Sequence, residues 1–231
     1  MAKKKVSRKE LLKGPDEFLT VSSRAVIFFN EHARQFSYVG AAIVLIILVY
    51  LGFNFYVNYM NKKGQIAYNE AYYTLSKDTD SKTETDNLKQ LEALFAKVTD
   101  EYGRSKASRL ALPELANLKF RGSNYDEAIS YYNRFLSKVP EDNAYRSLAM
   151  LALAACYEEK EDYKKSIDIL TQIVSAPDDF FRDQIMFSLA RVYRLSNQQE
   201  KSRETLKEFV EKFQTSPFLP IAKALLDEYN S

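Results

Sequence analysis

The first strong pattern along the chain is an uncharged apolar run between Arg34 and Lys62. It holds 27 residues, which span roughly 40 Å as a helix, about the thickness of a bilayer with its headgroups. Its centre at positions 38–53, YVGAAIVLIILVYLGF, contains ten Val, Ile, Leu or Phe residues. Aromatic residues flank this centre, as membrane interfaces favour. The pattern predicts one membrane-spanning helix over residues 37–59.

Three kinds of apolar segment could produce such a run: a buried helix of a globular domain, a cleaved signal peptide and an uncleaved signal anchor. A buried globular helix seldom extends this far without a charged residue. A cleaved signal peptide ends in a small-residue site, whereas this run continues into Asn54, Phe55 and Tyr56. The pattern therefore favours an uncleaved anchor.

Charge is distributed unevenly on the two sides of the apolar run. Residues 1–36 hold eight basic and four acidic side chains, whereas residues 60–231 hold 25 basic and 27 acidic ones. A short basic flank stays in the cytoplasm, so we expect the tail, residues 1–36, to be cytoplasmic and the long C-terminal part to lie outside. A start signal at Gly14-Pro15-Asp16-Glu17 and apolar positions from Val21 to Phe36 predict an amphipathic helix in the tail.

Beyond Met60 the apolar residues recur at spacings of three and four, which predicts helices throughout. Three segments also align with one another, and their matched positions repeat after 38 and then 36 residues. They run from Leu115 to Pro140, from Leu153 to Pro177 and from Leu189 to Pro217. The matched positions keep their character: leucine at 115, 153 and 189, alanine at 116, 154 and 190, small at 128, 166 and 202, large at 132, 170 and 206, and large at 135, 173 and 209.

This repeat predicts antiparallel helical hairpins. A small residue in each hairpin lets its two helices pack closely, and the closing proline ends the second helix. One hairpin cannot bury its apolar face alone, so the hairpins are expected to stack. The predicted fold is therefore all-α, with a single N-terminal transmembrane helix followed by an α-solenoid.

Two further segments complete the predicted large domain. Residues 60–104 are expected to form an irregular helical hairpin, whose second helix ends at Tyr102 with Gly103 as its C-cap. Ser216-Pro217 is expected to start a capping helix that closes the repeats of residues 105–231. Pro113 predicts either a kinked helix or one that begins at about Leu112.

Residues suited to catalysis or metal binding are sparse. The chain has one cysteine, Cys156, and one histidine, His32, so we expect no disulfide and no cysteine or histidine metal site in the large domain. Residues 78–89 do not fit a calcium loop, because Thr83 and Lys89 stand where it needs Gly and Glu. No nucleophile-plus-base pattern or phosphate loop occurs, and the net charge of +2 gives no general attraction to nucleic acid. We therefore expect no enzyme activity, cofactor, metal, nucleic acid or small-molecule substrate.

The three aligned segments resemble the tetratricopeptide repeat, most clearly in GSNYDEAI at positions 122–129, whereas the third unit has Gln199 where that family favours Tyr. The resemblance implies that the first helix of each pair lines a protein-binding face. It places nine candidate residues there: Asn117, Phe120 and Arg121 from the first unit, Leu151, Ala155 and Glu158 from the second, and Phe187, Arg191 and Arg194 from the third. Packing against a neighbouring repeat is the alternative role for each large residue.

The whole arrangement, from about Phe36 to the C-terminus, resembles a bacterial family of proteins with a basic cytoplasmic tail, one signal anchor and a periplasmic tetratricopeptide domain. The known example is the ancillary subunit of the Sec translocon, which works with periplasmic chaperones on emerging proteins. The resemblance implies a scaffold or chaperone adaptor in the bacterial inner membrane. Its implied partners are the lipid bilayer and proteins, namely translocon subunits, periplasmic chaperones or emerging polypeptides.

Two other functions stay open from the residues. One is a scaffold for another cell-envelope assembly, division or secretion machine. The other is a signalling tether that uses the long basic tail in the cytoplasm.

Overall fold

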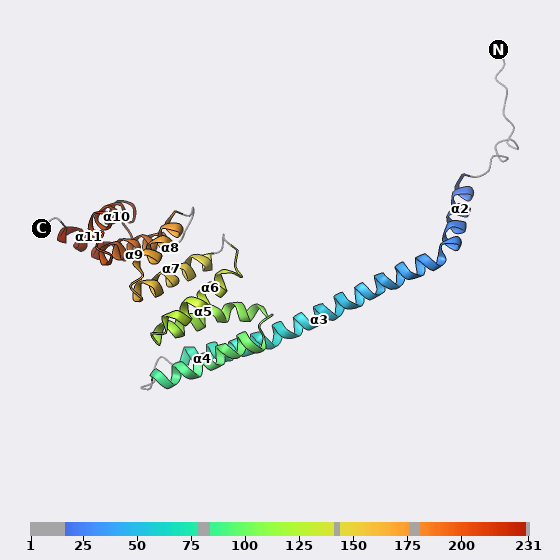
Figure 1. Cartoon of the computed structure of the whole chain (residues 1–231), viewed down its shortest axis with the longest axis horizontal. Coiled ribbons are helices and arrows are strands. Elements are labelled where there is room, and N and C mark those ends of the chain that lie inside the picture. The colour runs from blue at the N-terminus through green and yellow to red at the C-terminus, as the bar shows by residue number, and fades with distance from the viewer. Residues whose placement is uncertain (1–16, 78–83, 141–143, 176–180, 230–231) are drawn as a thin grey trace, which may run out of the picture. The chain divides into compact units, whose positions relative to one another are not determined.

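The computed structural model of the chain describes residues 17–77, 84–140, 144–175 and 181–229, and these residues form helices and no strand. Figure 1 shows the helices with their labels. The all-α prediction is confirmed. The chain divides into two compact units after Tyr56, and each is described by itself.

The first unit contains α2 (Glu17–Glu31) and the first part of α3 (Ala33–Lys77). The helices are joined at His32, whose backbone N–H donates to the Phe28 carbonyl oxygen at 3.1 Å. The rings of Phe28, Phe29, His32 and Phe36 contact one another at centroid distances of 4.4 to 6.4 Å. A helix is thus present in the predicted tail, while its expected start at residues 14–16 lies outside the described residues.

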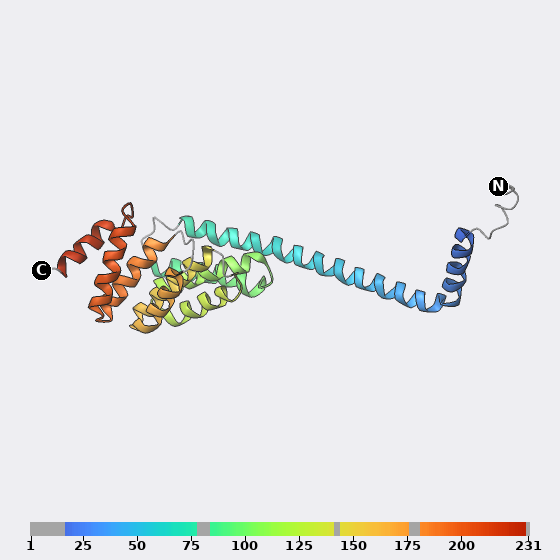
Figure 2. The ribbon, with the colours of Figure 1, turned by 90° about the horizontal axis from the view of Figure 1, so that it is seen from above.

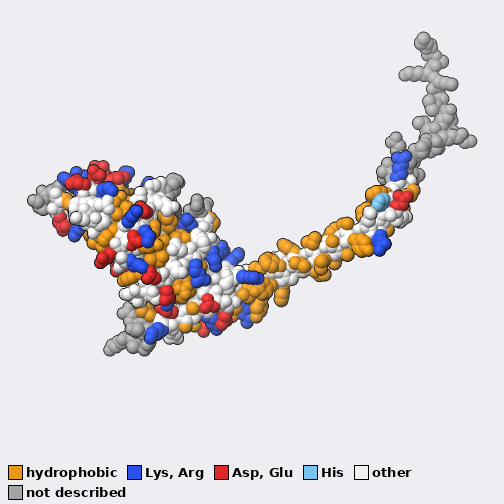
Figure 3. Space-filling model, viewed as in Figure 1, with side chains coloured by type: hydrophobic (Ala, Val, Ile, Leu, Met, Phe, Trp, Pro, Cys, Tyr) orange, Lys and Arg blue, Asp and Glu red, His pale blue; other side chains and the backbone are white. Residues whose placement is uncertain are grey.

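The apolar run lies inside α3, and its side chains are exposed. Figure 3 shows them as a continuous band of hydrophobic atoms along this helix. A helix that is apolar all round belongs in a protein core or a bilayer, and no part of this segment is buried in the protein. Among the described residues, α3 is the helix whose length and composition suit a membrane crossing.

The second unit begins at Val57 and is a row of antiparallel helices. After the C-terminal part of α3 come eight more described helices: α4 (Glu84–Glu101), α5 (Lys106–Arg121), α6 (Tyr125–Leu136), α7 (Ala144–Glu159), α8 (Tyr163–Val174), α9 (Arg182–Leu195), α10 (Gln199–Lys212) and α11 (Leu219–Glu228). From α4 onward each helix packs on the next one in the chain, as Figures 1 and 2 both show. Ala67 and Ala71 bring α3 into the same core as α4 and α5.

The repeated sequence positions form the core of this unit. All fifteen of the matched residues predicted from the alignment are buried: Leu115, Leu153, Leu189, Ala116, Ala154, Ala190, Ala128, Ser166, Ser202, Tyr132, Leu170, Leu206, Phe135, Ile173 and Phe209. The thirteen apolar residues among them belong to successive clusters, each shared by neighbouring hairpins. The stacked hairpins expected from the repeat are confirmed.

The turn inside each hairpin has the same backbone geometry. Its central residue is Ser123, Glu161 or Asn197, with φ of 59°, 58° and 60°. This left-handed conformation costs a non-glycine residue about 1 kcal/mol. It lets the next backbone N–H reach back to the first helix, as from Asn124 to the Lys119 oxygen at 2.8 Å. Because these bonds satisfy the last carbonyls of the first helix, they stop that helix and set the start of the second.

Helix α3 approaches the turn between α4 and α5 very closely. The backbone N–H of Lys106, the first residue of α5, donates to Asn61 Oδ1 at 2.8 Å. One turn further along α3, Gly64 is buried against Ser105, which itself caps α5 by accepting from the Ser108 N–H at 3.1 Å. The absence of a side chain at Gly64 therefore allows α3 to pack at this distance.

Two details of the predicted helix boundaries were wrong, and one of the two alternatives for Pro113 is excluded. Pro113 lies inside α5, which begins at Lys106 and not at Leu112, because the Ser105 cap fixes the start a full turn or more earlier. The last helix begins at Leu219 with Pro220 in its first turn. Ser216 is not the N-cap residue, which is Phe218; the Ser216 hydroxyl accepts from the Phe218 N–H at 3.2 Å and donates to Asp183 Oδ2 at 2.6 Å. Gly103 follows α4 without the positive φ of a glycine C-cap.

We expect Gly64→Ala to lower the free energy of unfolding. A Cβ here would lie 2.8 Å from Ser105 Cβ and 3.1 Å from Tyr102 Cβ. Overpacking of this kind costs about 1–3 kcal/mol, which outweighs the gain of about 1 kcal/mol that alanine brings to a helix interior. Urea unfolding of the full-length protein in mild detergent, followed by circular dichroism, measures the change.

Gly122→Ala is the matched control for this substitution. Gly122 has φ of −79°, and the nearest atom to an added Cβ is the Leu118 carbonyl oxygen at 3.5 Å. Its unfolding free energy should stay within about 0.5 kcal/mol of the parent. An equal loss in both variants would contradict a specific close contact at Gly64.

Ser166→Ala and Ser202→Ala should change stability in opposite directions, although the two serines hold equivalent places in successive repeats. Ser166 is 0% exposed, and its hydroxyl has no hydrogen-bond partner among the described residues. Removing an unsatisfied buried hydroxyl should stabilise the fold by about 1 kcal/mol. Ala128 already fills the matching place in the preceding repeat.

Ser202 is 1% exposed but fully engaged. Its hydroxyl donates to the Ala190 carbonyl oxygen at 2.9 Å and accepts from the Tyr229 hydroxyl at 3.1 Å. Loss of the Ser202 hydroxyl should destabilise the fold by about 1–2 kcal/mol. The same unfolding experiment measures both variants, and equal shifts of one sign would show that the hydrogen bonds do not decide the outcome.

Candidate protein-binding surface

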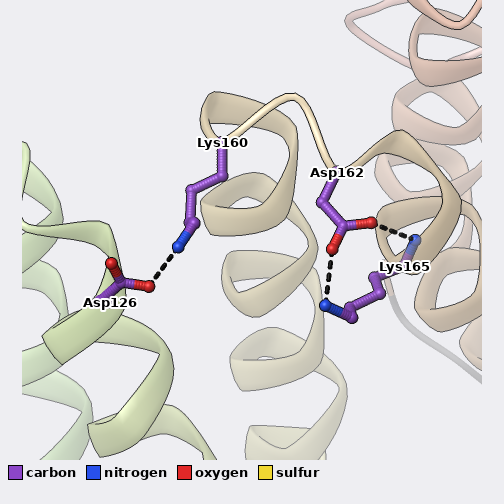
Figure 4. A network of polar contacts seen from close by, with 4 residues as sticks. All are labelled: Asp126, Lys160, Asp162 and Lys165. Carbon is purple, nitrogen blue, oxygen red and sulfur yellow. Dashed lines mark hydrogen bonds and ion pairs between the residues drawn. The ribbon is translucent and has the colours of Figure 1, made fainter.

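Polar contacts connect neighbouring hairpins along the edge where their turns lie. Lys160 lies in the loop between α7 and α8 and forms an ion pair with Asp126, near the start of α6. Figure 4 shows this pair. Beside it, Asp162 caps α8 by accepting from the Lys165 N–H at 3.3 Å, and it also pairs with the Lys165 ammonium at 2.6 Å. Exposed pairs of this kind contribute little to stability, and of the two only the Lys160–Asp126 pair joins one hairpin to the next.

Four of the predicted binding residues meet in one hollow between α7 and α9. Leu151, Ala155, Glu158 and Arg191 line a cavity of about 300 Å³. Arg191 Nη2 pairs with Glu158 Oε2 at 2.9 Å across the two repeats. Burial raises the pKa of Glu158 above its ordinary value, although the nearby guanidinium opposes that shift. The hollow thus offers small apolar walls beside one ion pair.

Asn117 lines a second hollow, between α5 and α7. This cavity has a volume of about 400 Å³ and includes Glu114, Tyr145 and Leu148. Asn117 is exposed on α5, so its amide can donate to and accept from a bound peptide backbone. This hollow adjoins the Glu158–Arg191 hollow, because Leu148 lines both. Asn117 itself lies on the corresponding helix of the preceding repeat.

The other four predicted residues have contacts of their own. Phe187 stacks on Phe218 at 5.1 Å between ring centroids and also touches Phe209. Phe120 packs edge-on against Tyr125 at 5.5 Å. The remaining two are arginines near the ends of their helices: Arg194 pairs with Glu228 at 3.3 Å, and Arg121 is exposed in the last turn of α5. Packing within the fold therefore engages both of the predicted aromatic residues.

A larger groove, which the sequence analysis did not predict, lies between α3, α5, the end of α6 and the start of α7. Its volume is about 820 Å³. We call it the tyrosine groove and define it by six of its lining residues: Tyr68, Tyr72, Tyr73, Lys106, Arg109 and Tyr145. The clustering of tyrosines at positions 68, 72 and 73 was visible in the sequence. The pairing of that helix face with α5 and α7 was not.

The lining of the tyrosine groove includes a half-buried acid, Glu114. Burial raises the pKa of Glu114, although a hydrogen bond with Tyr68 opposes the shift. Burial and the neighbouring Glu114 carboxylate together raise the pKa of Tyr68 to about 12. Tyr68 also packs edge-on against Phe95 at 5.8 Å, which fixes its ring in the core. The Tyr68 hydroxyl and the Glu114 carboxylate are therefore held against each other in the groove.

The described residues contain no group of three or more His, Cys, Asp or Glu side chains placed to hold a metal ion. Cys156 is buried, and burial raises the pKa of its thiol to about 11. A thiol in this state is a poor nucleophile at neutral pH.

Residues 28–186 match a family model described as a tetratricopeptide repeat-like domain, and residues 184–216 match a tetratricopeptide repeat model. No curated protein matches the chain. Two solved structures of nearly identical TPR-like repeats from a kinesin light chain of Podosopora anserina, one of them a variant of the other, are similar in fold. Each is 15% identical in sequence to this chain, and each match covers 72% of this chain and 84% of the solved chain. The TM-scores are 0.57 and 0.56. The chain belongs to the tetratricopeptide repeat-like domain family, whose stacked hairpins serve as protein–protein interaction scaffolds.

Proposed function

We propose that this protein is a membrane-tethered scaffold or chaperone adaptor on the periplasmic face of a bacterial inner membrane, associated with the Sec translocon. One observation carries the proposal. The family match over residues 28–186 includes both the exposed apolar run and the first hairpins of the stack. One family model therefore covers the apolar run together with the first interaction repeats. The Sec association rests on the resemblance of the whole arrangement to the translocon's ancillary subunit.

The anchor is residues 37–59, with residues 1–36 in the cytoplasm. The ten Val, Ile, Leu and Phe residues of positions 38–53 favour insertion by about 3–6 kcal/mol. Such a surface left in water would be a strong aggregation hazard. The basic tail supplies the positive charge that keeps this end inside.

The periplasmic part comprises the hairpin of residues 60–104 and the repeats of residues 105–231. Its hollows lie along the first helices of successive pairs. They expose both apolar side chains and charged groups. Surfaces of this kind bind extended peptides or partner helices. Because tetratricopeptide folds are typically non-catalytic, the protein acts by holding partners and not by changing them chemically.

A reporter enzyme that is active only outside the cytoplasm tests the orientation. Fused to the C-terminus of the full chain, it should be active in cells, because the anchor would carry the repeats across the membrane. The control is the same fusion without residues 37–59, which should be inactive. An inactive full-length fusion would contradict the proposed orientation.

Site-specific photo-crosslinking in native membranes tests the partner. A crosslinking side chain in place of Asn117 or Arg191 should form adducts with channel subunits of the translocon. One in place of Lys207, which is exposed on α10, should form far fewer. Adducts from the two hollows that contain only other envelope proteins would contradict the Sec association. They would favour a scaffold of another envelope assembly.

A further inference from the structure

The walls of the tyrosine groove include exposed large apolar side chains from three separate helices. Tyr73 on α3 is 61% exposed, Tyr145 on α7 is 65% exposed and Leu110 on α5 is 44% exposed. Tyr72 lies on α3 beside Tyr68, with the two rings stacked at 6.0 Å between centroids. Large apolar side chains gathered around one concavity mark an interaction site far more often than single exposed residues do.

The polar groups around the groove are mainly hydrogen-bond donors. Lys106 and Arg109 are one turn apart on α5 and therefore on the same face, and neither has an ion-pair or hydrogen-bond partner for its side chain among the described residues. Asn69 Oδ1 accepts from Gln65 Nε2 at 2.8 Å, and the Asn69 amide N–H groups can donate to a ligand. The carboxylate among the described residues that line the groove, Glu114, is hydrogen-bonded to Tyr68.

A donor-rich aromatic groove requires a ligand that supplies acceptors. A proline residue has a carbonyl oxygen but no N–H. Proline-rich segments adopt an extended helix without internal hydrogen bonds, and their flat rings pack on aromatic side chains. An amphipathic α-helix is a poorer match because its carbonyl oxygens are already bonded within the helix.

We propose that the tyrosine groove binds a proline-rich, extended segment of a partner protein that carries an acidic residue. The proline rings pack on Tyr72, Tyr73 and Tyr145. The acidic side chain pairs with Lys106 and Arg109, and the Asn69 amide donates to a backbone carbonyl. This assignment rests on the proposed scaffold function and names the chemistry of one partner.

Fluorescence anisotropy with the full-length protein in mild detergent tests the assignment. The probe is a fluorescein-labelled peptide of prolines interrupted by aspartates, with an amidated C-terminus. It should bind saturably and more tightly than a peptide of equal length and charge with glycine and serine in place of proline. It should also bind more tightly than an amphipathic helical peptide of leucine and glutamate. The absence of saturable binding, or tighter binding of either comparison peptide, would overturn the proposal.

Two variants locate the binding on the protein. Tyr73→Ala combined with Tyr145→Ala should weaken binding on the order of tenfold, because aromatic anchors carry most of the energy of such contacts. The matched control is Ile221→Ala on α11, which is 53% exposed and lies outside the groove, and it should leave the affinity unchanged. Equal effects of the two changes would overturn the placement.

Arg109→Glu tests the charge pairing without removing a ring. It should weaken binding of the aspartate-containing peptide by several-fold more than binding of an all-proline peptide of the same length. Equal weakening of both peptides would overturn the role of Arg109. All variants should show the parent's urea unfolding curve, which separates loss of the groove from loss of the fold.

The outcome is separable from that of the proposed function. Crosslinks from Asn117 or Arg191 to translocon subunits, together with no binding of the proline peptide, would reject the groove assignment alone. Binding of the proline peptide without those crosslinks would support the groove and reject the Sec association.

Discussion

Close packing of two helices around a small side chain is the constraint on which the second unit depends. Ala128, Ser166 and Ser202 occupy this place in successive hairpins and are all buried. Because the backbones approach closely there, the larger residues one and two turns further on must fill the space toward the next hairpin. The core is therefore a chain of small clusters, each completed by its neighbour. A single hairpin would leave half of its cluster exposed.

Helix α3 has different surroundings in the two parts of its sequence. Its apolar run is exposed, whereas Gly64, Ala67 and Ala71 are buried in the first cluster of the stack. Only a few residues separate these segments, and Asn61 already bonds to the first residue of α5. In the proposed membrane setting, partners in or crossing the bilayer would meet the repeats at a high effective concentration.

The surfaces available for binding differ in chemistry. The hollow between α7 and α9 is small, and its charges are paired across the repeat boundary by Glu158 and Arg191. The tyrosine groove is larger and aromatic, with two cations that make no ion pair among the described residues. Cations without an ion-pair partner among the described residues, lying beside exposed rings, leave more interaction energy for a ligand than a pair that must first be separated. The two surfaces can therefore serve different partners on one scaffold.

The sequence by itself determined the helical class, the repeat period and the buried positions. Hydrophobic periodicity and the recurrence of small residues are local consequences of helix packing, so they can be read along the chain. Helix boundaries were less certain, because Ser105 and Asn61 cap α5 through contacts that Pro113 did not reveal. The roles of single exposed residues also depended on context. Phe187 has the same helical position as Leu151, yet it stacks on Phe218 from the last helix.

Only the tertiary structure decided where a groove forms. Tyr73, Arg109 and Tyr145 lie far apart in the sequence and share no repeat position, yet three helices bring them around one cavity. A cavity is a property of the gap between packed elements, and that gap depends on how closely they approach. Here a residue without a side chain, Gly64, sets part of that distance for α3. The pattern along the chain records which faces are buried, but not the spaces that remain between them.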